Sequence, residues 1–253
     1  MHRYFLHLAY NGSPFHGWQR QKNAHSVQAE IEESMSKLFQ KNISTMGCGR
    51  TDTGVHARSF YLHFDLEEEI ENKSNTVYRL NQMLPKSISI FECHKVHDEA
   101  HARFDASSRT YRYYIIHEKD PFNQDFNAFF PGNFNLEAMN NAADKLLDYK
   151  DFTSFSKVHT ETFTNECDII FARWSEQENG IVFEIKANRF LRNMVRAIVG
   201  TCLEVGKEKM SIEDFKAVIN AKDRQKAGHS VPAKGLFLEQ VEYPFIKKKK
   251  TKL

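Results

Sequence analysis

Apolar and polar side chains alternate along several short stretches of the chain, as expected for strands that bury one face of a sheet. The clearest stretch has Phe60, Leu62, Phe64 and Leu66 alternating with Tyr61, His63 and Asp65. Similar patterns predict strands at residues 3–10, around Met46, and at 58–66, 87–96, 110–116, 169–174, 181–187 and 236–243. The chain therefore contains enough strands for a large sheet.

Other stretches repeat apolar residues every three or four positions, which is the period of an amphipathic helix. One such stripe consists of Val27, Ile31, Met35, Leu38 and Phe39. Helices are predicted at 27–39, 76–83, after Asn135, and at 190–205 and 212–219; Ser211 with Asp214 three residues on predicts a capping box. Because helices and strands mix without strict alternation, the chain is predicted to be α+β with a largely antiparallel sheet.

Length and composition indicate two domains. With 253 residues, 13% of them aromatic, the chain is long enough for two cores. The boundary is predicted near residues 97–108, giving an N-terminal half at 1–102, a C-terminal half at 103–246 and a basic tail at 247–253. The pattern contains no membrane span or cleavable signal, and the four cysteines are far apart, so a reduced cytoplasmic setting is expected.

The segment GRTDTGVHA at residues 49–57 concentrates functional groups between glycines. It places Asp52 on a loop that enters the strand at 58–66. A cation such as Arg50 would favour the ionised carboxylate, and an ionised, partly desolvated aspartate is a competent nucleophile. The alternative is a polar turn in which the Asp52 side chain bonds the local backbone.

Three arginines, Arg189, Arg192 and Arg196, are spaced to share one face of a helix predicted to begin near Arg189. The face also carries asparagines and has no acid before Glu204. This composition favours recognition of a phosphate or carboxylate over an ordinary solvated face.

A second basic and aromatic pattern lies on the strand-like stretch 109–114, where Arg109, Tyr111 and Tyr113 share one face. Such a face suits stacking on bases and neutralising phosphates in RNA. An edge strand with ordinary tyrosine packing is the alternative. The net charge of +2 is too small to decide between them.

No metal or cofactor is expected. His56, His63 and Asp65 lack the spacing of a metal site, and the glycines at 47, 49 and 54 match neither a dinucleotide nor a phosphate loop. The chain also lacks GxSxG, so a serine hydrolase has no local support.

The chain resembles the tRNA pseudouridine synthase A family. GRTDTGVHA is similar to the family's GRTDAGVHA, and five further blocks follow in family order: YNGSPFHGWQRQ, HARFDASSRTYRYY, DFTSFS, ANRFLRNMVRAIVG and PAKGLFLEQVEYP. Thr53, Phe60 and Ala100 depart from the usual family residues, which leaves fine substrate preference open.

The resemblance implies a role for each candidate residue. Asp52 is the implied nucleophile, Tyr111 stacks on the target uracil, Arg196 pairs with the aspartate and Arg50 is associated with displacing the target nucleotide. Further RNA contacts are expected from Arg20, Arg109, Arg189 and Arg192. These expectations involve no metal and no cofactor.

The resemblance also implies two α+β halves joined by a continuous sheet, with the active cleft between them. A homodimer would grip one tRNA and isomerise uridines 38, 39 and 40 of the anticodon stem-loop. Two other classes remain: an RNA-binding protein without activity, and a hydrolase or glycosylase that uses Asp52. A glycosylase would release free uracil, whereas an isomerase would not.

Overall fold

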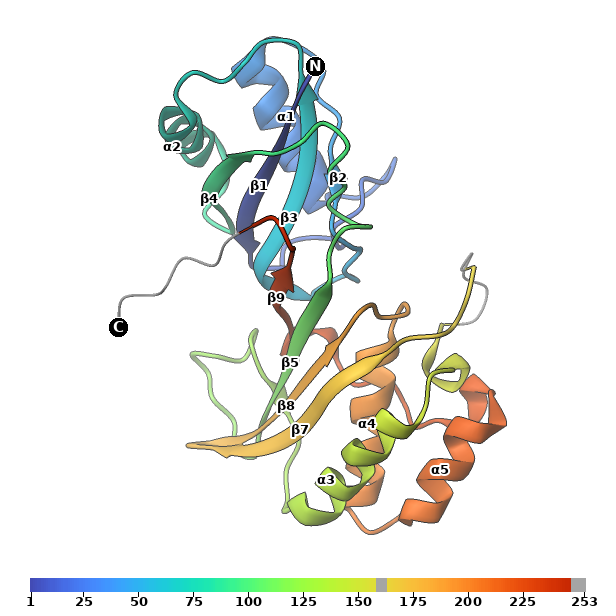
Figure 1. Cartoon of the computed structure of the whole chain (residues 1–253). Helices are drawn as coiled ribbons and strands as arrows, with labels where there is room; N and C mark the ends of the chain where they lie inside the picture. Colours follow the sequence, from blue (N-terminus) through green and yellow to red (C-terminus); the bar gives the residue numbers. More distant parts are fainter. Residues whose placement is uncertain (158–162, 247–253) are drawn as a thin grey trace. The chain divides into compact units, whose positions relative to one another are not determined.

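The computed structural model describes residues 1–157 and 163–246, which contain nine strands and five α-helices (Figure 1). The strands are β1 His2–Tyr10, β2 Met46–Gly47, β3 His56–Leu66, β4 Ile88–Lys95, β5 Ser108–Ile116, β6 Ala128–Phe129, β7 Ile169–Gln177, β8 Gly180–Ala187 and β9 Leu236–Glu242. The helices are α1 Val27–Phe39, α2 Lys73–Met83, α3 Leu136–Lys145, α4 Met194–Gly206 and α5 Ile212–Ala221. The predicted basic tail at 247–253 lies outside the described residues.

The strands form one sheet in the order β4-β1-β3-β9-β5-β8-β7, with β2 added to β3 and β6 added to β5. The pairs β1/β3, β1/β4 and β7/β8 are antiparallel, whereas β5/β6 is parallel. The predicted α+β class with a largely antiparallel sheet is therefore confirmed.

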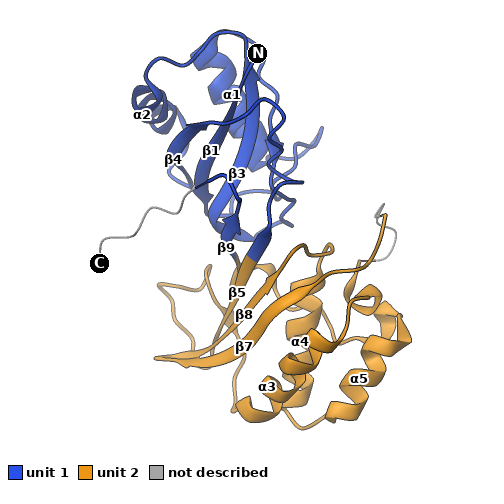
Figure 2. Cartoon of the chain, in the orientation of Figure 1, with its two compact units in different colours: residues 1–109, 238–253 blue, residues 110–237 orange. Residues whose placement is uncertain are grey.

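The chain divides into two compact units, one of residues 1–109 with the end of the chain from 238, and one of residues 110–237 (Figure 2). The first unit thus takes in residues 103–109 and 238–246, which the sequence assigned to the C-terminal half. Assignment of two domains with a boundary at 102/103 stays a prediction.

In the first unit, α1 buries its apolar stripe through Val27, Ile31 and Met35. The side chain of Ser26 caps this helix by accepting from the Ala29 N–H. The pairing of β1 with β3 shifts register between Leu8 and Tyr10, next to the start of β3. A shift of this kind bends a strand and redirects its side chains, and here it lies beside the loop that precedes β3.

In the second unit, α3, α4 and α5 pack on one another, and α3 also packs on β7 (Figure 1). Helix α4 is nearly all buried, and its few half-exposed residues include Arg196. The predicted capping box at the start of α5 is confirmed, because Ser211 and Asp214 bond each other's backbone N–H groups.

The helix predicted at 190–205 begins four residues later, at Met194. Asn193 precedes it in the left-handed region, with φ 68°. Asparagine adopts this conformation more readily than most residues, but a helix cannot continue through it. The hydrophobic period of the sequence therefore continues across a turn that is not helical.

Candidate active site

Asp52 lies on the loop between β2 and β3, and its residue is half-buried. The Asp52 carbonyl accepts the Val55 N–H at 3.1 Å, and Gly54 has φ 75°, so residues 52–55 form a tight turn. The sequence prediction of a loop that leads into a strand is confirmed, although the strand begins at His56 instead of Arg58.

Residues 10–18 hold this loop in place. The Trp18 N–H donates to the Thr51 carbonyl at 3.2 Å, and the Tyr10 hydroxyl lies 2.8 Å from the Thr51 hydroxyl. The Gly12 N–H donates to Nδ1 of buried His56 at 3.0 Å. Contacts on both sides of Asp52 therefore fix the backbone that carries it.

Gly12 and Gly17 permit the close approach of these two segments. A Cβ on Gly12 would lie 2.0 Å from the Val55 carbonyl oxygen, and one on Gly17 would lie 2.4 Å from the Thr51 oxygen. Gly17 also has φ 86°, which strains any other residue. Both glycines lie in the YNGSPFHGWQRQ block, but the local pattern does not reveal their role because the contact is long-range.

We expect Gly17→Ala to lower the free energy of unfolding by about 2 kcal/mol or more, since backbone strain and a steric clash combine. Gly49→Ala is the matched control: it lies in the Asp52 loop, its φ is not positive, and its added Cβ meets no atom within 4 Å. Urea unfolding of both variants measures the difference. Equal stabilities would contradict the proposed packing.

Arg50 and Arg20 lie in the same unit as Asp52. Arg50 is exposed, and its Nε donates to Gln19 Oε1 at 3.1 Å. The Arg20 guanidinium lies 3.0 Å from Glu32 Oε2 and 3.7 Å from Glu33 Oε1. A phosphate that binds the Arg20 guanidinium would therefore compete with the carboxylates of Glu32 and Glu33.

Arg109, the third predicted basic residue of this unit, supports the backbone. Its guanidinium donates to the carbonyl oxygens of Ala106 at 3.1 Å, Cys48 at 3.0 Å and Arg103 at 2.6 Å. Cys48 begins the stretch that leads to Asp52. The Arg109 side chain thus stabilises the site loop, and an RNA contact through it stays a prediction.

Tyr111 lies on β5 in the second unit, half-buried, with its ring edge-to-face against Phe190 at 5.1 Å between centroids. Tyr113 is fully buried, and its hydroxyl donates to the Pro232 carbonyl at 2.8 Å. Of the two alternatives that the sequence left open, ordinary tyrosine packing is therefore the one observed at Tyr113, which is a core residue.

Arg196 lies in the first turn of α4, and its Nε donates to the Val231 carbonyl at 2.7 Å. The Val231 N–H donates back to the Arg196 carbonyl at 3.3 Å. Farther along α4, a Cβ on Gly200 would lie 1.8 Å from the His229 carbonyl oxygen. The segment 228–231 thus packs tightly on α4 and orients the Arg196 guanidinium.

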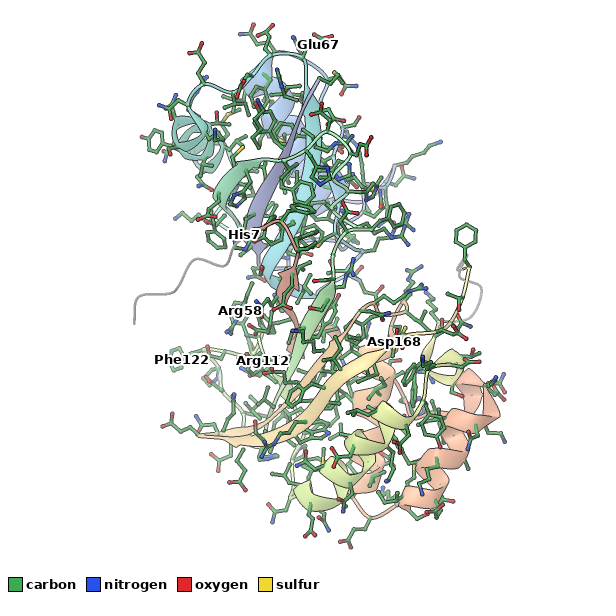
Figure 3. All side chains as sticks on the ribbon, in the orientation of Figure 1. His7, Arg58, Glu67, Arg112, Phe122 and Asp168 are labelled. Carbon is green, nitrogen blue, oxygen red and sulfur yellow. The ribbon has the colours of Figure 1, made fainter. Side chains whose placement is uncertain are left out.

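The predicted arginine face on one helix is wrong. Arg189 and Arg192 precede α4, and only Arg196 lies on it, because Asn193 interrupts the helical backbone. The Arg192 carbonyl accepts the Lys157 N–H at 3.0 Å. Asn188, beside Arg189, is bonded through both side chain and backbone to Asp168, which Figure 3 labels. Loop geometry therefore positions these two arginines.

The predicted site residues fall into two groups. Asp52, Arg50, Arg20 and Arg109 belong to the first unit, and Tyr111, Arg189, Arg192 and Arg196 belong to the second. Sequence reasoning missed three supporting residues, Gly12, Gly17 and Gln19, whose contacts join segments far apart in the chain.

Structural partners are present for His56, His63 and Asp65. His63 Nδ1 accepts the Ala102 N–H at 3.1 Å, and burial lowers the His63 pKa to about 4. Asp65 forms a two-bond pair with Arg3, which lowers the Asp65 pKa. Residues 1–157 and 163–246 contain no group of three or more His, Cys, Asp or Glu that would hold a metal ion.

In the same residues, no helix is long and apolar enough to span a membrane.

Comparisons with known proteins identify relatives of this chain. A family model described as tRNA pseudouridine synthase matches residues 142–244. The chain is 52% identical to tRNA pseudouridine synthase A of Parabacteroides distasonis, over 96% of this chain and 97% of that protein. It is 48% identical to the enzyme of the same name from Bacteroides thetaiotaomicron, over 96% and 91%, and 38% identical to that from Clostridium acetobutylicum, over 94% and 98%.

Proposed function

Because the chain belongs to the tRNA pseudouridine synthase A family, we propose that it isomerises uridine to pseudouridine in tRNA with Asp52 as the nucleophile. The reaction detaches the base from its ribose, rotates it and reattaches it through carbon. No group is gained or lost and no net oxidation occurs, so the chemistry requires no cofactor. It does require a carboxylate, a nearby cation and a platform for the uracil.

The observation that carries this proposal is the position of Asp52. It lies half-buried on a loop fixed from both sides, at Thr51 by Trp18 and Tyr10 and at His56 by Gly12. A nucleophile on a rigid backbone can be held near its target without loss of conformational entropy during the reaction.

Tyr111 and Arg196 supply the aromatic and cationic groups in this proposal. Phe190 supports the Tyr111 ring, which is proposed to stack on the displaced uracil. Val231 orients the Arg196 guanidinium, which is proposed to pair with the Asp52 carboxylate. Arg50 is proposed to displace the target nucleotide.

The proposed substrate region is the anticodon stem-loop, at uridines 38, 39 and 40, and the proposed assembly is a cytoplasmic homodimer. Arg20, Arg109, Arg189 and Arg192 are proposed to contact the RNA backbone. Unstacking the target nucleotide costs about a few kcal/mol, which phosphate contacts and stacking on Tyr111 would offset.

Tritium release from tRNA labelled at uridine C5 tests the isomerase function. Forming the carbon–carbon bond displaces the C5 hydrogen, so an isomerase releases tritium and leaves the base in the RNA. A glycosylase releases labelled free uracil instead. An RNA-binding protein without activity releases neither product, so the assay separates all three classes.

We expect substitutions of Tyr111 to separate its ring from its hydroxyl. Tyr111→Ala should reduce pseudouridine formation by about tenfold or more, since stacking on a base is worth about 1–3 kcal/mol. If the hydroxyl moves the C5 proton, Tyr111→Phe will also be inactive while binding tRNA normally. Single-turnover rates and tRNA binding measure both effects, and full activity of Tyr111→Ala would reject the stacking role.

The affinity for tRNA should fall steeply with added salt, because each neutralised phosphate releases condensed counterions. Binding titrations at several salt concentrations, with the solution mass measured in parallel, test this expectation and the dimer together. A flat salt response would reject the electrostatic contacts. A fully active monomer would reject a tRNA site shared between subunits.

A further inference from the structure

A chain of side-chain hydrogen bonds leads from Arg50, two residues before Asp52, to Glu32 on α1. Arg50 Nε donates to Gln19 Oε1 at 3.1 Å, and Gln19 Nε2 donates to Gln28 Oε1 at 2.9 Å. Gln28 Nε2 then donates to Glu32 Oε1 at 3.0 Å. Every bond points from the guanidinium toward the carboxylate, an arrangement in which successive bonds polarise one another.

Glu32 is the last residue of this series of hydrogen bonds, and its carboxylate is held in place by further donors. Its residue is only 7% exposed. Glu32 Oε1 also accepts the Thr45 N–H at 2.9 Å and the Thr45 hydroxyl at 3.1 Å, and Oε2 accepts from Arg20 Nη1 at 3.0 Å. A buried carboxylate held by several donors is costly to displace, because each lost bond leaves charge unsatisfied.

The backbone of residues 17–20 is attached to the same helix. The Val27 N–H donates to the Gly17 carbonyl at 3.2 Å, and the Gln28 N–H donates to the Trp18 carbonyl at 3.0 Å. The Arg20 N–H donates to Gln28 Oε1 at 3.0 Å. Gln19 is therefore held through its neighbours and through its own amide, so it presents a fixed acceptor to Arg50.

We propose that Gln19 and Gln28 are positioning residues that fix the Arg50 side chain on the Asp52 loop, with Glu32 as their anchor. The proposal deepens the proposed function and rests on it. An exposed arginine loses rotamer entropy when it engages a ligand. Fixing Nε through Gln19 removes part of that loss beforehand, while the two Nη groups take no part in this chain.

The test is a double-mutant cycle with Gln19→Leu, Arg50→Ala and the double variant. Gln19 is half-buried, so its replacement should leave the protein folded, which a thermal unfolding midpoint checks. Gln21→Leu is the matched control, since the Gln21 amide donates to the His16 carbonyl at 3.2 Å instead of joining the chain. Single-turnover pseudouridine formation and tRNA affinity are measured for each variant.

We expect Gln19→Leu to reduce the single-turnover rate about tenfold or more, as for loss of one hydrogen bond to a charged group. Affinity for tRNA and the unfolding midpoint should stay near those of the wild type, and Gln21→Leu should retain its rate. In the Arg50→Ala background, Gln19→Leu should change the rate by less than about twofold, because the two residues act as one unit.

If the rate reductions of the two single variants multiply in the double variant, the positioning role is overturned. A wild-type rate for Gln19→Leu or for Arg50→Ala would overturn it as well. A rate loss explained by a lower unfolding midpoint would also overturn it. Inactivity of the wild-type protein on tRNA would reject the proposed function itself. If only the positioning proposal fails, the wild-type protein will be active and the two substitutions will affect the rate independently of each other.

Discussion

Asp52→Asn is expected to abolish pseudouridine formation, with a loss of about a thousandfold or more, while tRNA still binds. The amide is nearly the size of the carboxylate but is not a competent nucleophile. Removing a group on which the covalent step depends has effects of this order in other enzymes. The hydrogen bonds that fix the loop come from Tyr10, Gly12 and Trp18, so the fold should tolerate the change.

Asp98→Asn is the matched control, because it makes the same chemical change at an exposed carboxylate of the same unit. Tritium release, tRNA affinity and thermal unfolding should be measured for both variants. If Asp52→Asn and Asp52→Ala both retain near wild-type turnover, another residue is the nucleophile. A loss of activity in Asp98→Asn would point to a general charge effect.

Arg196→Met is expected to reduce activity by about a hundredfold or more, with a much smaller effect on stability or tRNA affinity. The methionine keeps the apolar stem within α4 but removes the guanidinium proposed to hold Asp52 ionised and oriented. Charged groups aimed at a reacting centre contribute about 3 kcal/mol or more when they are fixed in advance. Loss of the Nε bond to the Val231 carbonyl should cost only about 1 kcal/mol of stability.

Arg224→Met separates the chemical role from a structural one. Arg224 supports the same segment, since its guanidinium donates to the Gly228 carbonyl at 3.2 Å and the Ser230 hydroxyl at 2.7 Å. Steady-state kinetics should show a large fall in kcat only for Arg196→Met. Equal losses in both variants would mean that Arg196 acts by supporting residues 228–231, and the proposed pairing with Asp52 would be discarded.

Local pattern was sufficient for much of the fold. The predicted and observed bounds of α1 agree at both ends, and the capping box of α5 was visible in Ser211 and Asp214. These features depend on side chains within one or two turns of each other, so the sequence contains all the interacting groups. The loop position of Asp52 was predictable for the same reason, because glycines and polar residues precede an alternating strand.

By itself, the sequence determined the mixed α+β class, the candidate nucleophile and, through its ordered motifs, the family. Only the tertiary structure decided how particular side chains are used. Tyr113 belongs to the alternating pattern of β5 but is buried, and its hydroxyl donates to the Pro232 carbonyl. The Arg109 guanidinium donates to backbone carbonyl groups. Asn193 ended a hydrophobic period that looked continuous. Periodicity indicates which residues share a face. Packing between distant segments determines which residues contact that face.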